Sequence, residues 1–197
     1  LPEDLTKEYL VGEKKLDGSR YVLYLGCDPY GRQSGNTLLS RRISVTDGKH
    51  VDRTANVPHI TGLDYADLEG TVIDGEIQSV DFLSTNSIMN SAPRLAIQKQ
   101  EKIGPVNYYV WDVMFFRGKD IRGLELSKRR KVLEAVVERM QNGNIVLLEQ
   151  VKVDLEGFFT KIVNAGGEGI IVKDLRMAYG ISWAKMKRST DVSCIVS

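Results

Sequence analysis

Cysteine and histidine are scarce in this sequence of 197 residues, which holds two of each. Cys27 and Cys194 have no metal-ligand spacing and form no disulfide framework, as is common for proteins of a reducing compartment. His50 and His59 lie far from any cysteine pair, so a zinc site is not expected.

Long apolar runs and phosphate-binding P-loops are missing as well. No stretch approaches the roughly 20 apolar residues of a membrane span, and no secretory signal opens the chain. Gly48-Lys49 and Gly118-Lys119 lack both the glycine five residues earlier and the following Ser or Thr of a P-loop. Kinase-type chemistry is therefore disfavoured, and we expect an intracellular protein, cytoplasmic or in the nucleoid, without membrane contact.

The chain also lacks an excess of charge of either sign. Lys and Arg number 27 and Asp and Glu number 26, which gives a formal net charge of +1. A protein that binds nucleic acid over its whole surface is expected to have a clear excess of positive charge, which this chain lacks. Basic residues come in short groups instead, and the group at 128–131 is interpreted as a solvated helix start.

What the chain does contain is the material of an α+β domain. Hydrophobic residues make up 42% of it, enough for a sizeable core. Apolar spacing predicts a helix that begins with Ser127 as its N-cap and stops at Gly143, a second at 155–165 and a third around 91–100. The glycine-rich stretch 26–40 is expected to be a loop or long hairpin. Strands are predicted at 21–25, 43–46, 71–80, 106–116, 145–153, 169–173 and 182–187.

The most informative stretch runs from Glu13 to Arg20 and reads Glu-Lys-Lys-Leu-Asp-Gly-Ser-Arg. Residues two apart in an extended segment project to the same side, so Asp17 is expected beside Lys15. A lysine amine attacks phosphorus only when it is neutral, and its ordinary pKa is about 10.4. Nearby cations or desolvation must therefore lower that pKa. Taken alone, residues 15–18 fit an ordinary solvated turn at least as well.

This stretch resembles motif I of the covalent nucleotidyltransferase superfamily, which comprises DNA ligases, RNA ligases and mRNA capping enzymes. Five later segments resemble that family's further motifs in order: 39–42 motif Ia, 73–77 motif III, 108–116 motif IIIa, 167–173 motif IV and 183–187 motif V. Each segment alone has a simpler explanation, such as a hairpin turn, core packing, a glycine-rich loop or a solvated strand face. Their joint order favours the resemblance.

The resemblance implies three groups of site residues. The catalytic group is Lys15, Asp17, Lys185 and Lys187. The nucleotide-binding group is Glu13, Arg20, Arg41, Glu76, Trp111, Glu168 and Lys173, and the metal ligands are Glu76 and Glu168.

The resemblance also implies a reaction. Lys15 attacks the α-phosphorus of ATP, with Mg²⁺, Lys185 and Lys187 stabilising the phosphate charge, and AMP then passes to a 5′-phosphate at a nick in double-stranded DNA. In this scheme Arg20 and Glu76 hold the ribose and Trp111 stacks on adenine. The Glu13 region recognises the base, and Arg41 contacts sugar or strand.

Glu13 before Lys15, the segment after motif IIIa and Trp183 before the motif V lysines favour the ATP-dependent DNA ligase branch. The core of an RNA ligase or of an mRNA capping guanylyltransferase is the alternative, and a nucleotide-binding module without turnover is the alternative from another class. The implied fold is the DNA ligase/mRNA capping enzyme nucleotidyltransferase fold, which is ATP-grasp-like, with antiparallel sheets flanked by helices.

The expected organisation is one adenylation domain over residues 1–190. Residues 191–197 are expected to begin a hinge to an OB-fold domain that this chain lacks, and the start at Leu1 without Met suggests a fragment. We expect a monomer, and a viral or prokaryotic origin fits the resemblance.

Overall fold

The computed structural model describes residues 4–45 and 48–188, which fall into two compact units. Unit 1 takes residues up to Leu16, Glu149–Asp174 and the residues from Ser182 onward. Unit 2 takes Asp17–Leu148 and Leu175–Ile181. Within the described residues, no helix has the length and apolar character needed to cross a membrane.

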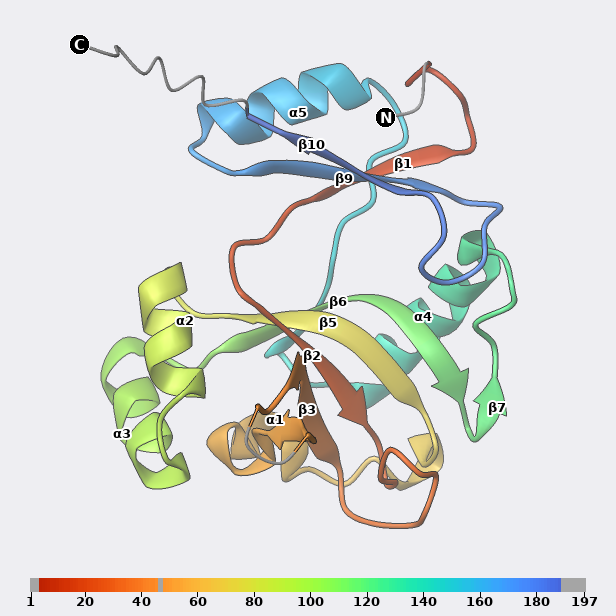
Figure 1. The fold of residues 1–197 in the computed structure, drawn as a ribbon. Coiled ribbons are helices and arrows are strands. Elements are labelled where there is room, and N and C mark those ends of the chain that lie inside the picture. The colour runs from red at the N-terminus through yellow and green to blue at the C-terminus, as the bar shows by residue number, and fades with distance from the viewer. Residues whose placement is uncertain (1–3, 46–47, 189–197) are drawn as a thin grey trace, which may run out of the picture. The chain divides into compact units, whose positions relative to one another are not determined.

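Unit 1 is a three-stranded antiparallel sheet with one helix on it. The strands are β1 (Leu10–Lys14), β9 (Gly169–Asp174) and β10 (Trp183–Lys187), in the order β1-β9-β10. Helix α5 (Leu155–Asn164) lies along the sheet (Figure 1). Alternate residues of a strand face opposite sides, so the second face of the sheet carries Glu13, Lys173, Lys185 and Lys187 beside the apolar Val11 and Ile171. The apolar layer beneath the helix consists of Leu10, Leu155, Phe158, Phe159, Ile162, Ile170, Val172, Ala184 and Met186, with Leu5, Tyr9 and Val151 at its margin.

Unit 2 is built on a seven-stranded sheet in the order β4-β3-β2-β5-β6-β7, with β8 pairing β6. The strands are β2 (Ser19–Tyr24), β3 (Thr37–Ile43), β4 (His50–Asp52), β5 (Val72–Gln78), β6 (Asn107–Phe116), β7 (Lys119–Asp120) and β8 (Ile145–Leu147). All pairs are antiparallel except β6 with β8, which is parallel.

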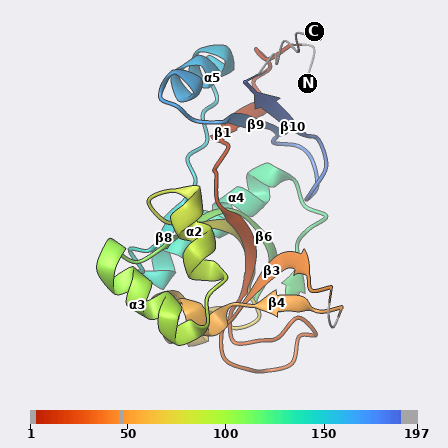
Figure 2. The same ribbon diagram turned by 60° about the vertical axis from the view of Figure 1, so that its left-hand side comes forward.

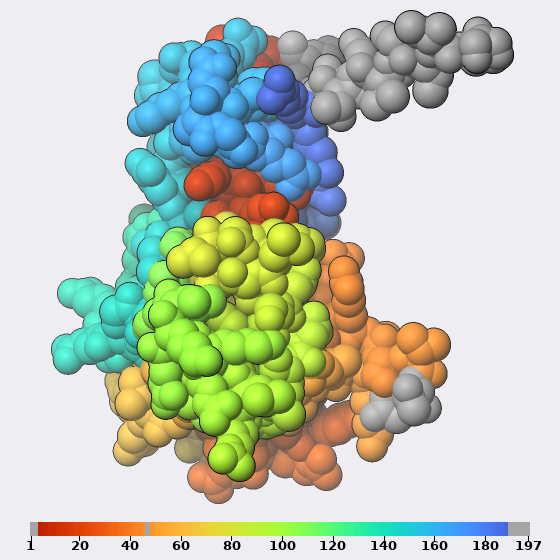
Figure 3. All heavy atoms as spheres, turned by 90° about the vertical axis from the view of Figure 1, so that its left-hand side faces the viewer, coloured from red at the N-terminus to blue at the C-terminus, as the bar shows by residue number. Residues whose placement is uncertain are grey.

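Helices cover unit 2 as well. They are α1 (Pro58–Thr61), α2 (Phe82–Met89), α3 (Pro93–Ile103) and α4 (Leu126–Met140), with 3₁₀ turns at Thr54–Asn56 and Ala66–Leu68. Helices α2 and α3 lie next to one another (Figure 2). Together they form most of the yellow-green surface in Figure 3. Leu83 of α2 and Ile103 of α3 line a small hollow between the two helices.

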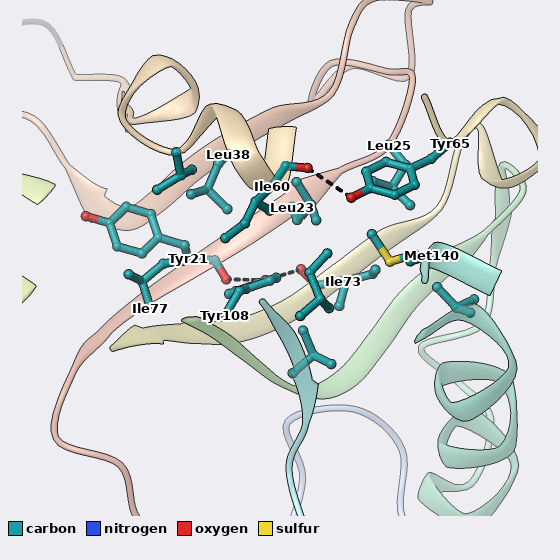
Figure 4. Packing of buried hydrophobic residues seen from close by; sticks show 14 of the residues in the cluster. Tyr21, Leu23, Leu25, Leu38, Ile60, Tyr65, Ile73, Ile77, Tyr108 and Met140 are labelled. Atoms are coloured by element: carbon teal, nitrogen blue, oxygen red, sulfur yellow. Dashed lines mark hydrogen bonds between the residues drawn. The ribbon is translucent and has the colours of Figure 1, made fainter. Parts of the chain in front are cut away.

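The core of unit 2 lies around the middle of its sheet. Tyr108 is fully buried, and its hydroxyl lies 2.9 Å from the carbonyl oxygens of both Tyr21 and Ile73 and shares its one hydrogen between them (Figure 4). A buried phenol needs such partners because an unpaired hydroxyl in an apolar core costs about 1 to 3 kcal/mol. These bonds hold β2, β5 and β6 together at the place from which the site residues of unit 2 project.

Several sequence predictions are confirmed. The protein is α+β with mainly antiparallel sheets, and the helices expected at 155–165 and around 91–100 are α5 and α3. The helix after residue 126 also exists, but its predicted ends are wrong. Ser127 lies inside α4, Glu125 precedes the helix without a side-chain cap, and Gln141 ends it in a left-handed conformation at φ 46°.

The stretch 26–40 is only partly a loop. Strand β3 begins at Thr37, earlier than the strand predicted at 43–46, and Leu38 and Leu39 are buried in it. The buried part of β3 is short, and polar residues precede it, so the apolar pattern of the sequence did not predict where the strand begins. Strand β1 was not predicted either, because Glu13 and Lys14 interrupt its apolar run. Residues 191–197, the expected start of a hinge, lie outside the described residues, and the single domain over 1–190 stays a prediction.

The basic group at 128–131 is not simply a solvated helix start, because Arg129 is fully buried. Its guanidinium donates to both carboxylate oxygens of Asp112, at 2.7 and 2.8 Å, and to the carbonyl of Met177 at 3.1 Å. One basic residue in four therefore belongs to the core, a position that a sequence pattern of charges does not reveal.

Candidate functional site

The first cluster of predicted site residues lies at one end of the unit 1 sheet. Lys15 directly follows β1, and its backbone N–H donates to Gly169 O at 2.9 Å, which places it beside the start of β9. The Lys15 amine forms an ion pair with Glu168 Oε2, and Lys187 Nζ lies 2.8 Å from Glu168 Oε1. One carboxylate therefore bridges two lysines.

Gly169 explains how Glu168 reaches this position. Its φ is 143°, a conformation that favours glycine, and a Cβ there would lie 2.0 Å from the carbonyl oxygen of Met186 on β10. The chain enters β9 in close contact with β10, directly after Glu168. Glycine is therefore required after Glu168 by the backbone conformation and by the close approach of β10.

The electrostatics of Glu168 follow from its two partners. Partial burial raises the pKa of its carboxyl group, but the hydrogen bonds from Lys15 and Lys187 outweigh burial, and the net pKa lies below the ordinary value of 4.5. Glu168 is therefore ionised at neutral pH. Its side chain is 34% exposed, so a ligand can reach the carboxylate from solvent.

Lys185 stands on the same strand as Lys187 and two residues before it. Ala184 and Met186, which alternate with them, pack in the apolar layer under α5. Both lysines therefore project from the opposite face of the sheet, and both are exposed. The prediction that they share a face is confirmed.

A second group of charges in unit 1 is buried. Lys173 Nζ lies 2.6 Å from Glu13 Oε2 and 4.3 Å from the centroid of the Trp183 ring, and both charged side chains are 2% exposed. Gln150 Nε2 donates to Glu13 Oε1 at 2.9 Å. Lys173 was predicted in the nucleotide-binding group, and its ion pair is with Glu13. This pair joins β1 to β9 from within, because Glu13 and Lys173 lie on neighbouring strands.

In unit 2 the predicted residues converge on Asp74, which is fully buried in β5. Arg20 Nε donates to Asp74 Oδ1 at 2.9 Å, and Arg20 Nη2 donates to Oδ2 at 2.5 Å. Trp111 Nε1 also donates to Oδ2, at 3.1 Å, and the Arg20 guanidinium lies 5.6 Å from the Trp111 ring centroid. Tyr179 completes the group, because its hydroxyl donates to Oδ2 at 2.7 Å.

Strand register brings this group together. Arg20 on β2 pairs with Glu76 on β5, and Asp74 lies two residues before Glu76, on the same side of the strand. The predicted ribose contacts, Arg20 and Glu76, are thus direct cross-strand neighbours. Arg41 is exposed on β3, and Asp17 is exposed in the turn before β2, where its carbonyl accepts from Gln78 Nε2 at 3.4 Å.

Burial and charge fix the protonation of this second group. Burial lowers the pKa of the Arg20 guanidinium, but its hydrogen bonds to Asp74 raise the pKa by more, so Arg20 stays charged. Burial and the neighbouring charge of Asp74 raise the pKa of the Tyr179 phenol well above its ordinary value of 10.0. The phenol therefore remains a hydrogen-bond donor at every working pH.

Sequence reasoning missed two members of these clusters. Asp74 lies in the segment 73–77 but was not among the predicted site residues, although strand periodicity places it on the same face as Glu76. Tyr179 gave no signal, because it lies between two motifs in a short irregular segment. The hollow between α2 and α3 contains none of the predicted residues.

The metal prediction has weaker geometric support. Among residues 4–45 and 48–188, no group of three or more His, Cys, Asp or Glu side chains could hold a metal ion. Both carboxylate oxygens of Glu168 have lysine partners. The described residues therefore offer single carboxylates rather than a metal cage.

Comparison with known proteins shows to which protein family the chain is similar. A family profile described as "ATP dependent DNA ligase domain" matches residues 3–191. The DNA ligase of Nitrosopumilus maritimus is 27% identical over 183 residues, which cover 89% of this chain and 30% of that ligase. This chain thus spans about a third or less of the curated relatives that it matches.

Solved structures agree with the profile. A mycobacterial DNA ligase D complexed with ATP and MES has a TM-score of 0.62 and 25% identity, and the match covers 90% of this chain and 54% of that one. The ATP-dependent DNA ligase from bacteriophage T7 in complex with ATP has a TM-score of 0.66 at 17% identity, covering 95% and 66%. The predicted nucleotidyltransferase fold is confirmed by these matches.

Proposed function

The chain belongs to the ATP-dependent DNA ligase domain family, and from this premise we propose that it is a ligase core that transfers AMP from ATP to Lys15. The observation that carries the proposal is the bridge of Lys15 and Lys187 by the single carboxylate of Glu168. A covalent lysine nucleophile needs a nearby group that orients its amine, and Glu168 supplies one.

In the proposed first step, the Lys15 amine attacks the α-phosphorus of ATP. The N–P bond forms, the bond from the α-phosphorus to the bridging oxygen breaks, and pyrophosphate leaves. The amine loses a proton in this step, and Glu168 is the nearest acceptor. Lys185 and Lys187, exposed on one face of β10, stabilise charge on the α-phosphate.

The nucleoside contacts come from the second cluster in this proposal. Arg20 and Glu76 hold the ribose, and Trp111 provides the aromatic surface for adenine. Trp111 is only 8% exposed, so stacking uses a limited part of its ring. Glu13 contributes to base recognition through its backbone, since its carboxylate is committed to Lys173 and Gln150.

Mg²⁺ would be held by carboxylates of this chain together with the phosphates of ATP. Mg²⁺ commonly binds through one or two carboxylates together with substrate phosphates, so a protein cage is not required. Glu168 and Glu76 are the proposed carboxylates. A bound Mg²⁺ neutralises phosphate charge.

The proposed partner is nicked double-stranded DNA. In the second step a 5′-phosphate oxygen attacks the lysine-bound AMP and releases Lys15, and in the third a 3′-hydroxyl attacks that phosphate and releases AMP. Arg41 contacts sugar or strand. We propose that the protein acts as a monomer inside the cell, where ATP and DNA are found, and that an OB-fold domain assists the later steps.

The test is intact mass after incubation with Mg²⁺ and ATP, GTP or NAD, each separately. We expect an adduct of AMP with ATP alone, and its loss in Lys15→Ala. Lys14→Ala is a matched control, since Lys14 is the exposed neighbour at the end of β1. An adduct with GTP would favour the capping enzyme core, and an adduct that survives Lys15→Ala would overturn the nucleophile.

A further inference from the structure

The segment Leu175–Ile181, between β9 and β10, is held firmly within unit 2. The backbone N–H groups of Leu126 and Ser127 each donate to its carbonyl oxygens at 2.9 Å, and Tyr179 N–H donates to Arg122 O at 2.9 Å. The buried Arg129 guanidinium lies 5.9 Å from the Tyr179 ring centroid. Both the backbone and the ring of Tyr179 are therefore fixed independently of its hydroxyl.

The Tyr179 hydroxyl has a specific place in the Arg20–Asp74 pair. It donates to Asp74 Oδ2 at 2.7 Å and accepts from Arg20 Nη2 at 2.9 Å. Arg20 Nη2 thus donates one hydrogen to Asp74 and one to Tyr179, and the two bonds together restrict rotation of the guanidinium. A bidentate carboxylate alone fixes the plane of a guanidinium, and a third partner on Nη2 also resists sliding within that plane.

We propose that Tyr179 is a positioning residue that holds Arg20 in the orientation needed to contact the ribose of the bound nucleotide. This inference rests on the proposed function, in which Arg20 is a ribose contact. Tyr179 itself does not touch the nucleotide. It acts by donating to Asp74 and accepting from Arg20, so its effect on nucleotide binding passes through Arg20.

The first test removes only the hydroxyl. Tyr179→Phe keeps the ring that packs against Arg129, so the fold is expected to persist. We expect the ATP concentration for half-maximal lysine–AMP formation to rise about tenfold, since a hydrogen bond to a charged group is lost, with the maximal rate nearly unchanged. A uniform loss of binding that leaves the rate intact is what a ground-state ribose contact predicts.

A ribose readout separates positioning from a general structural effect. Wild-type protein is compared with Tyr179→Phe using ATP, 2′-deoxy-ATP and 3′-deoxy-ATP. If Arg20 contacts a ribose hydroxyl, the wild type discriminates against the analogue that lacks it, and Tyr179→Phe reduces that discrimination several-fold. Equal weakening of all three nucleotides would overturn the proposal.

Tyr65→Phe is the matched control. Tyr65 is a buried tyrosine of unit 2 with two hydrogen bonds of its own, to Ile60 O at 3.1 Å and from Asn142 Nδ2 at 2.9 Å, and it has no bond to Arg20. We expect it to leave the ribose discrimination unchanged. A similar change in both variants would contradict a role specific to Tyr179.

A spectroscopic measurement keeps this inference separate from the proposed function. The side-chain Nε–H resonance of Arg20, assigned by its loss in Arg20→Lys, reports the guanidinium directly. We expect a slowly exchanging resonance in wild type and Tyr65→Phe, and a shifted, faster-exchanging one in Tyr179→Phe. An unchanged resonance would refute the positioning role, whereas absence of any AMP adduct in wild type would refute the proposed function alone.

Discussion

At the scale of single residues, the buried pair of Arg129 and Asp112 gives the clearest prediction for the free energy of unfolding. Arg129 and Asp112 are both fully buried, and removing one partner leaves the other charge without compensation in the core. We expect Arg129→Ala to lower the free energy of unfolding by about 3 to 5 kcal/mol. Urea unfolding followed by circular dichroism measures this.

The neighbouring lysine provides the comparison for that prediction. Lys128 is 61% exposed and forms a surface ion pair with Glu125 one turn away, so Lys128→Ala is expected to change stability by about 0.5 kcal/mol or less. Similar losses in the two variants would show that burial of Arg129 contributes little. The contrast tests the correction to the sequence interpretation of residues 128–131 as one solvated group.

Glu168 gives a pH-dependent prediction. Its pKa in the folded protein is lowered, so its ion pairs stabilise the fold fully above the ordinary value of 4.5 and are lost as pH falls through the folded pKa. The side chain is 34% exposed, and solvent screening therefore limits the effect to about 1 kcal/mol. We expect Glu168→Gln to be less stable than wild type at pH 7, and the difference to shrink at a pH below the lowered folded pKa.

Unfolding in urea at both pH values provides the measurement, with Glu149→Gln as the control. Glu149 is an exposed acid of the same unit, and its substitution is expected to have little effect at either pH. A stability difference for Glu168→Gln that persists undiminished at low pH would contradict the ion-pair explanation.

At the scale of elements, Gly75 shows how closely β5 and β6 approach. A Cβ on Gly75 would lie 2.5 Å from the carbonyl oxygen of Tyr109 and 2.8 Å from the Tyr108 ring, which two hydrogen bonds hold in place. We expect Gly75→Ala to destabilise the protein by about 1 to 3 kcal/mol through overpacking. Thermal unfolding measures the change.

Gly143 is the control for crowding. A Cβ there meets nothing within 4 Å, and its φ is not in the left-handed region. Gly143→Ala is therefore expected to be neutral or to stabilise by a few tenths of a kcal/mol, up to about 1 kcal/mol, by restricting the unfolded chain. Equal destabilisation by both alanines would rule out the close approach at Gly75 as the cause.

The elements that sequence predicted are those with a regular apolar face. Helix α5 was found because Leu155, Phe158 and Ile162 recur at helical spacing. Helix α2 was missed because Ser, Thr and Asn occupy half of its positions and its tertiary contacts decide its conformation. Apolar spacing therefore does not predict a helix such as α2, which contributes few large apolar side chains to the core.

The site residues divide in the same way. The short-range pairing of Lys185 with Lys187 could be predicted, because strand periodicity alone places them on one face. The pairing of Glu13 with Lys173 and the convergence on Asp74 could not, since these partners are far apart in sequence and meet only through strand register. Motif order pointed to most of the proposed site residues but not to Asp74 or Tyr179, and tertiary structure determines which side chains they contact.

At the scale of the whole molecule, the near balance of charge limits how the chain could hold the proposed DNA substrate. With a formal net charge of +1, the chain does not attract the phosphate backbone over its whole surface, so the proposed DNA contact would rely on a few exposed basic residues such as Arg41. We expect nicked duplex binding to weaken with salt with a log–log slope no steeper than about −4, since each phosphate contact contributes about −0.9.

Fluorescence anisotropy with a nicked duplex between about 50 and 200 mM salt tests this, with Arg41→Ala and Arg94→Ala compared. Arg41→Ala is expected to reduce the magnitude of the slope by about 0.9, because it removes one phosphate contact. Arg94 is also exposed, on α3, and lies outside every predicted motif, so Arg94→Ala should leave the slope unchanged. A slope near −8, or equal effects of the two substitutions, would mean that the chain binds DNA through a broad basic surface and that Arg41 has no special part in it.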